Sequence, residues 1–294
     1  MPTMSQNKRR EKESIIEWIL TLEQKQKLLE GRFERYRRTV EGLVLSFIQE
    51  NGLDVDESPT AWRKKASRSA IERLRVEIDF ILEGSLSGIG RDEAEKVVIP
   101  KRANYADVIG VMVTLETIRL MSDVETFIQG VLEDTVTKEF AKQGSMIGLE
   151  KQYFVNQLPD VMKAITQDDW SERIWGMYQT ELRNQVNQLV RESLLRGYNP
   201  KKIAFELRKT IDRGRYNAER LMRTEQARVQ GQSQIEAYKA QNITLFDLIV
   251  EPDGCKHCHE VAARGPYLVE EAVIGVNVEP IHPNCRCSTV GVLE

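Results

Sequence analysis

Residues 14–48 read SIIEWILTLEQKQKLLEGRFERYRRTVEGLVLSFI, and this stretch carries the strongest structural signal in the chain. Its apolar residues recur alternately four and three positions apart, a 3.5-residue period that keeps one seam of a helix against a partner helix. We therefore expect a long helix in a coiled-coil-like contact, either as an internal hairpin or between chains. The seam positions are Ile15, Ile19, Leu22, Gln26, Leu29, Phe33, Tyr36, Val40, Leu43 and Phe47, of which only Gln26 breaks the apolar series.

Helical periodicity continues to about residue 241. Apolar spacing predicts helices over residues 60–83, 104–142 and 169–196, then a short helix from Asn199-Pro200 and a further one over 217–240. The glycines at 84, 88 and 90 are expected to break the chain, and Gly197 is a plausible helix end. The helix over 217–240 is unusually polar, so we expect it to offer few core positions.

The sequence changes character near residue 242. Residues 244–250 (TLFDLIV) favour a strand, and residues 288–293 (STVGVL) can form a closing strand. The predicted fold class is therefore mainly α, a long-helix body followed by a small C-terminal α+β module. We expect three regions: a helical N-terminal region (1–150), a second helical part (151–241) and a Cys/His-rich β module (242–294).

Composition excludes several classes of protein. The 294 residues are 41% hydrophobic and 30% charged, with a net charge of -3, so the chain can form a core and is not histone-like. We see no apolar run of membrane-spanning length and no signal-peptide pattern, so an intracellular protein is expected. Between residues 185 and 223, ten Lys/Arg face four acids. Such a run could contact DNA or an acidic partner, although most are simply solvated.

All four cysteines and all three histidines lie between Cys255 and Cys287. Cys255-x2-Cys258 has the spacing of a zinc knuckle, and three further ligands follow in His282, Cys285 and Cys287. The spacing leaves two zinc sites open. One uses three cysteines and His282 with Cys287 spare, and the other uses all four cysteines with His282 holding the loop. The alternatives to a zinc site are a disulfide and a metal-free core that contains reduced cysteines. A complete four-ligand set indicates a structural zinc, because catalytic zinc needs an open position.

Enzyme motifs are sparse in this sequence. We find no phosphate-binding loop, dinucleotide fingerprint, HExxH or GxSxG pattern. His282-Pro283-Asn284 after a cysteine pair resembles part of an HNH nuclease site, but that chemistry needs a general base and further metal ligands. A metal-dependent nuclease and a DNA-binding zinc module are therefore kept as alternatives.

Three segments together resemble a known family. Residues 197–243 carry Arg223, Thr224 and Glu225 on a helix, and they are followed by CKHC (255–258) and EPIHPNCRC (279–287). This combination is similar to phage minor head proteins of the Mu-F-like head morphogenesis family, over about residues 185–290. The sequence departs from the family before the cysteine pair, where it reads Glu-Pro-Asp-Gly (251–254), and in the late position of Gly265.

The resemblance implies a non-enzymatic component of the phage head, with no catalytic residues. It implies a place at the portal vertex of the virion or procapsid, with the portal protein as partner. The resemblance also implies contacts with the major capsid or scaffolding protein and with packaged DNA. It implies no contact with a membrane. The N-terminal helices would then be a portal-docking arm. For the Arg-Thr-Glu motif we consider that Arg223 and Glu225 dock the helix onto the knuckle loops, or that Glu225 pairs with Arg286. The alternative is a solvated helix face.

Overall fold

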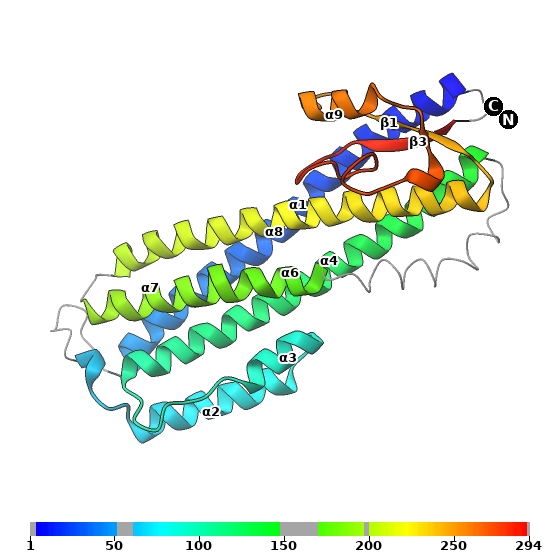
Figure 1. Ribbon diagram of the computed structural model, residues 1–294. Coiled ribbons are helices and arrows are strands. Elements are labelled where there is room, and N and C mark those ends of the chain that lie inside the picture. Colours follow the sequence, from blue (N-terminus) through cyan, green and yellow to red (C-terminus); the bar gives the residue numbers. More distant parts are fainter. Residues whose placement is uncertain (1–3, 52–60, 148–169, 197–199, 293–294) are drawn as a thin grey trace. The chain divides into compact units, whose positions relative to one another are not determined.

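The computed structural model describes residues 4–51, 61–147, 170–196 and 200–292. It is mainly helical with a few short strands near the C-terminus, as the sequence predicts (Figure 1). Within these ranges, no helix combines the length and the apolar character needed to cross a membrane. The helices are α1 (Met4–Glu50), η1 (Ala61–Arg63), α2 (Arg68–Glu83), α3 (Gly88–Glu95), α4 (Tyr105–Ile147), α6 (Trp170–Met177), the π-helical η2 (Tyr178–Arg183), α7 (Asn184–Leu195), α8 (Pro200–Ala240), α9 (Lys256–Ala262) and η3 (Val269–Glu271).

The chain forms two compact units, and each unit is assembled from separate stretches of sequence. Unit 1 consists of Met1–Lys27, Ile128–Trp170 and Glu219–Glu294, and unit 2 consists of Leu28–Phe127 and Ser171–Ala218. Each unit is described by itself below. The sequence-based division at residues 150 and 241 stays a prediction.

In unit 2, the seam of α1 forms part of the core. Leu29, Phe33 and Val40 are at most 1% exposed, and the buried Tyr36 hydroxyl lies 2.6 Å from the hydroxyl of Thr117 on α4. This seam is therefore buried within the chain, against α4. Whether α1 also forms a coiled coil with another molecule stays a prediction.

Side-chain caps start the shorter helices of unit 2. Ser67 accepts a hydrogen bond from the Ala70 amide at the start of α2, and Ser87 accepts one from the Gly90 amide at the start of α3. Such caps satisfy amides that have no partner inside the helix. The chain does break at Gly84, where α2 ends. Because Ser87 provides a cap, however, the helix resumes across the other two glycines instead of remaining a loop.

The two helices predicted after residue 199 are one helix, α8 (Pro200–Ala240). Its predicted apolar stripe is present, since Ile203, Leu207 and Ile211 are at most 2% exposed. Gly214 does not interrupt the helix. A β-carbon there would lie 2.0 Å from Leu182 Cδ1, so the glycine allows α8 to pack closely against η2. The predicted helix-end residues Gly197 and Asn199 lie outside the described residues.

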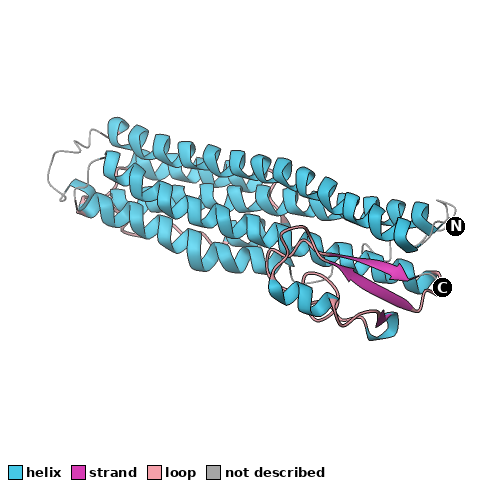
Figure 2. Cartoon of the chain, turned by 90° about the horizontal axis from the view of Figure 1, so that it is seen from above, coloured by secondary structure: helices cyan, strands magenta, loops and turns pink. Residues whose placement is uncertain are grey.

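In unit 1, three antiparallel strands form a sheet in the order β2-β1-β3. The strands are drawn in magenta in Figure 2. β1 (Leu245–Ile249) and β3 (Ser288–Val292) are the two strands predicted from sequence, and β2 (Tyr267–Leu268) is a further, two-residue strand. Phe246 on β1 is fully buried in a cluster with Tyr238 of α8, and Ile249 and Val290 pack with Ile15 of α1. The sheet therefore depends on helices from distant parts of the sequence.

The polar part of α8 is buried rather than solvated, which corrects the expectation of few core positions. Gln230, Ser233 and Gln234 are at most 5% exposed. Gln234 donates to Glu139 of α4 and to the Ser288 hydroxyl of β3, at 2.8 Å each. These polar side chains form hydrogen bonds with other buried polar groups, which is how polar residues are accommodated in a core.

A buried ion-pair network lies at the centre of these contacts. Lys142 Nζ is 2.8 Å from Glu11 Oε1 and 2.7 Å from Glu139 Oε1. The Ser288 hydroxyl donates to Glu11 Oε1 at 2.6 Å, and the Glu11 side chain is completely buried. We refer to Glu11, Glu139, Lys142, Gln234 and Ser288 as the buried polar network. It connects α1, α4, α8 and β3.

Candidate metal centre

The first half of the site is the N-terminus of α9. Cys255 is the N-cap of this helix, and its sulfur accepts a hydrogen bond from the Cys258 amide at 3.5 Å. This turn brings the two sulfurs to 3.6 Å from each other. Cys255 is exposed and Cys258 is buried, so the pair lies at the edge of the module.

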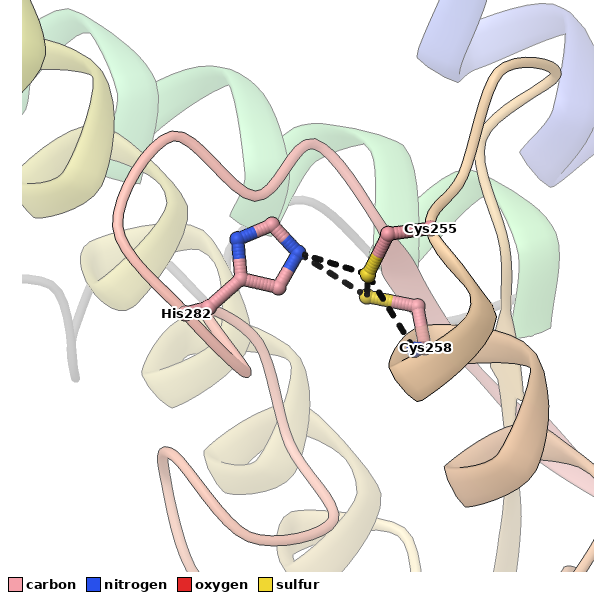
Figure 3. A group of neighbouring side chains, drawn as sticks. All are labelled: Cys255, Cys258 and His282. Atoms are coloured by element: carbon pink, nitrogen blue, oxygen red, sulfur yellow. Dashed lines mark hydrogen bonds between the residues drawn. The ribbon is translucent and has the colours of Figure 1, made fainter.

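His282 comes from the loop before β3 and points at both sulfurs (Figure 3). Its Nε2 lies 3.3 Å from Cys255 Sγ and 3.2 Å from Cys258 Sγ. Its other nitrogen, Nδ1, lies 2.9 Å from the carbonyl oxygen of Pro283. A proton on Nδ1 donated to this carbonyl leaves the Nε2 lone pair directed at the sulfurs, the arrangement usual for a histidine that binds a metal.

Cys285 and Cys287 complete the cluster from the buried side. Cys285 Sγ is 3.9 Å from Cys258 Sγ, and both residues belong to an apolar cluster with Leu248 of β1. Two groups of candidate ligands have all their ligand atoms within 4.8 Å: Cys255, Cys258 and His282, and Cys258, Cys285 and Cys287. Cys258 belongs to both groups. All five residues singled out in the sequence are thus brought together.

The distances around Cys258 fit the edges of a tetrahedral metal site. Ligands about 2.3 Å from zinc lie roughly 3.8 Å apart along the edges of a tetrahedron. The two sulfur–sulfur distances involving Cys258 are 3.6 and 3.9 Å, and the sulfur–nitrogen distances are slightly shorter, as the shorter zinc–nitrogen bond requires. The donor set of thiols and one imidazole is the set that zinc prefers, so the residues present fit a zinc ion.

The thiols of the site differ in pKa. A hydrogen bond from Cys287 and nearby backbone amides lower the pKa of Cys285 to about 6. Burial, followed by the proximity of Cys285, raises the pKa of Cys258 to about 12. A buried cluster of thiols therefore cannot release all its protons unaided. A bound cation favours the thiolate form and would remove this conflict.

The Arg-Thr-Glu motif of α8 holds the turn between His282 and Cys285. The Thr224 hydroxyl accepts from the Asn284 amide, and Arg223 donates to the Asn284 side-chain oxygen, both at 3.2 Å. Asn284 has a φ of 69°, the left-handed conformation that asparagine tolerates better than most residues. The motif and the turn therefore fix how His282 and Cys285 are presented.

Arg223 contacts the loop of the cysteine module through Asn284, as one sequence-based alternative predicts, whereas the acidic residues pair differently from the other two alternatives. Glu225, only 4% exposed, pairs with Arg228 one turn later at 2.8 Å, and Arg286 pairs with Glu251 at 2.5 Å. The Glu225–Arg286 pair is thus not formed, and Glu225 is not on a solvated face. His257 and His259 are exposed on α9 and belong to neither group of candidate ligands.

Sequence reasoning missed two features of unit 1. The first is the buried polar network, whose partners are up to 277 residues apart in sequence. The second is Glu279, which is completely buried and whose two carboxylate oxygens have no hydrogen-bond partner among the described residues. Its burial raises its pKa well above the usual range. Neither feature has a local sequence signal, because both arise from tertiary packing.

The fold and the cysteine cluster define a mainly helical protein with a small C-terminal module that carries candidate metal ligands. Comparison with known proteins identifies a family that this module resembles. Residues 184–290 match the family model described as Phage Mu protein F like protein. About a third of the chain thus matches a Mu-F-like domain, and this match supports a phage head-related protein. This confirms the resemblance seen in the sequence. Searches of curated proteins and of solved structures found no match.

Proposed function

We propose that the C-terminal module holds one structural zinc ion on Cys255, Cys258, His282 and Cys285. This set is supported by Cys258, whose sulfur lies 3.6 Å from Cys255 Sγ, 3.2 Å from His282 Nε2 and 3.9 Å from Cys285 Sγ. Zinc binding would have to draw Cys285 toward Cys255 and His282, because Cys285 groups within 4.8 Å only with Cys258 and Cys287. When bound, zinc would cross-link α9 to the loop before β3 and neutralise the thiolates. Four protein ligands leave no open coordination position, which supports a structural rather than a catalytic role.

Metal content distinguishes this set from the all-cysteine alternative. We expect close to one zinc per chain by elemental mass spectrometry of protein purified without chelator. Cys258→Ser and His282→Ala should each lose most of the zinc, whereas Cys287→Ser should retain it. The proposed set is wrong if His282→Ala retains zinc and Cys287→Ser loses it. Wild-type protein with well under one zinc per chain would exclude the site altogether.

We propose further that this protein is a non-enzymatic minor head protein that binds the portal vertex and acts in head assembly or in DNA packaging or ejection. The observation that carries this proposal is the family match over the helix α8 and the whole cysteine module. The long helices α1 and α4 support a docking role, because extended helical surfaces suit attachment to an oligomeric ring.

Particle composition tests this role. Procapsids and mature particles of the source phage are analysed by quantitative mass spectrometry, with this chain counted against the portal subunit. A small, fixed ratio to the portal supports the proposal. Absence from both particles, with the protein abundant in the lysate, refutes it. A plasmid-cleavage assay with Mg²⁺ is the next experiment in that case, with His282→Ala as its control.

A further inference from the structure

The first half of α8 exposes a row of cations and aromatic rings. Lys202, Phe205, Lys209, Arg213 and Tyr216 are all exposed, and Phe205 and Tyr216 remain 57% and 56% accessible. All five lie in unit 2. We call these five residues the α8 row. The residues that α8 contributes to the core lie on another face, so the two aromatic rings of the row are not needed for packing.

Helix geometry places the α8 row on a single stripe. At about 100° per residue, the five positions fall within roughly 80° of the helix circumference, and they extend over about 21 Å of its length. The nearby acids lie at the edges of the stripe and pair only at long distance. Lys209 is 3.8 Å from Glu206, and among the described residues Arg213 has no ion pair.

One contact within the row shows how rings and cations are combined. The Lys209 ammonium lies 4.4 Å from the centre of the Phe205 ring, a cation–π distance. The ring is thereby held beside a positive charge while over half of the side chain stays in water. Large exposed aromatic side chains among cations are the pattern by which proteins stack bases and hold the phosphates beside them.

We propose that the α8 row binds single-stranded nucleic acid. Its cations would contact phosphates, and Phe205 and Tyr216 would stack on unpaired bases. A duplex hides its base faces, so the rings would have no role there, and an acidic protein would use the cations alone. The proposal goes beyond the head-assembly role and does not depend on the metal centre, which lies in unit 1.

Fluorescence anisotropy with labelled (dT)20 and the full-length protein tests this inference. We expect Phe205→Ala/Tyr216→Ala to weaken binding about tenfold or more, because stacking contributes roughly 1–3 kcal/mol per base. Lys209→Gln/Arg213→Gln should make the slope of log K against log salt shallower by about 1.4, at roughly 0.7 per phosphate contact on a single strand.

A matched variant on another helix controls for general loss of charge or aromatic surface. Phe80 and Arg75 are exposed on α2 of the same unit, and Phe80→Ala/Arg75→Gln should leave (dT)20 binding unchanged. The inference is overturned if (dT)20 does not bind at 50 mM salt, or if the aromatic variant binds like wild type. It is also overturned if a 20-base-pair duplex or polyglutamate binds as tightly as (dT)20. None of these outcomes affects particle composition, so the two proposals can fail separately.

Discussion

Replacing Lys142 by methionine should destabilise unit 1 by about 3–5 kcal/mol, the usual cost of removing one partner from a buried ion pair. The contacts of Lys142 indicate a loss of stability at the upper end of the range for single substitutions. Lys142 is the cation shared by Glu11 and Glu139, with both distances below 3 Å, and these two carboxylates are at most 8% exposed. Without Lys142, two buried carboxylates are left close together with no countercharge.

The effect should depend on pH in a defined direction. Burial already raises the pKa of Glu11, and loss of Lys142 removes the main group that opposes this rise. In the variant, the folded state therefore binds protons that the unfolded state releases above about pH 4.3. Stability should fall as pH rises, so the difference from wild type should be larger at pH 8 than at pH 5.

Urea denaturation followed by far-UV circular dichroism, at pH 5 and pH 8, measures this difference. Lys138→Met is the matched control, since Lys138 lies one turn earlier on α4, is 69% exposed and pairs with Asp134. Its expected effect is within about 0.5 kcal/mol. The reasoning would be refuted by a Lys142→Met variant that loses less than 1 kcal/mol, or whose loss does not change with pH.

Three further substitutions probe other parts of unit 1. Glu279→Gln should stabilise the protein at pH 8 by about 1 kcal/mol or more, because burial raises the pKa of Glu279 and the cost of this carboxyl group to the folded state grows as the pH rises. The gain should shrink at pH 5, and an equal gain at both values would contradict this. Gly231→Ala should cost about 1–3 kcal/mol in urea denaturation, since its β-carbon would lie 2.8 Å from the Glu279 carbonyl oxygen. Gly130→Ala, where the added β-carbon meets open space, should be neutral or stabilising in the same experiment. Asn284→Ala should lower both the melting temperature and the zinc content. The substitution adds backbone strain at a φ of 69° and removes the hydrogen bond that Arg223 donates. Normal zinc retention would show that this turn does not position the ligands.

The positions of the long helices could be predicted because each carries its own periodic pattern. The stripe of α8 and most of the seam of α1 are buried as their spacing predicts, for example at Ile203 and Leu29, while the seam positions Ile19, Gln26 and Leu43 are half-buried. The interruptions were harder to predict. A glycine is a local signal for a break, but Gly214 is required for close packing against Leu182, a contact set by tertiary structure. The two-residue strand β2 is too short to leave any periodic signal.

The candidate metal centre was predictable because its cysteines and histidine are chemically distinctive and closely spaced in sequence. Choosing four ligands from five required three dimensions, since only the fold shows that His282 lies within 3.3 Å of both Cys255 and Cys258. The hydrogen bond of Thr224 could not be predicted from the sequence either, because its partner Asn284 is 60 residues away. Local chemistry thus predicted the ligands, and tertiary contacts determined how they are held.

The family-matched region should not fold by itself, although it contains every candidate zinc ligand. In unit 1, Ser288 and Gln234 form hydrogen bonds with Glu11 and Glu139, which lie outside residues 184–290. A fragment of residues 184–294 would leave these polar groups without their partners and would expose the apolar contact between Ile15 and the sheet. We therefore expect this fragment to show poor dispersion in NMR spectra with zinc present, and co-expression with residues 1–150 to restore the folded module. A fragment that folds and retains zinc without these helices would show that the buried polar network is dispensable. The Mu-F-like domain would then be complete within the matched residues.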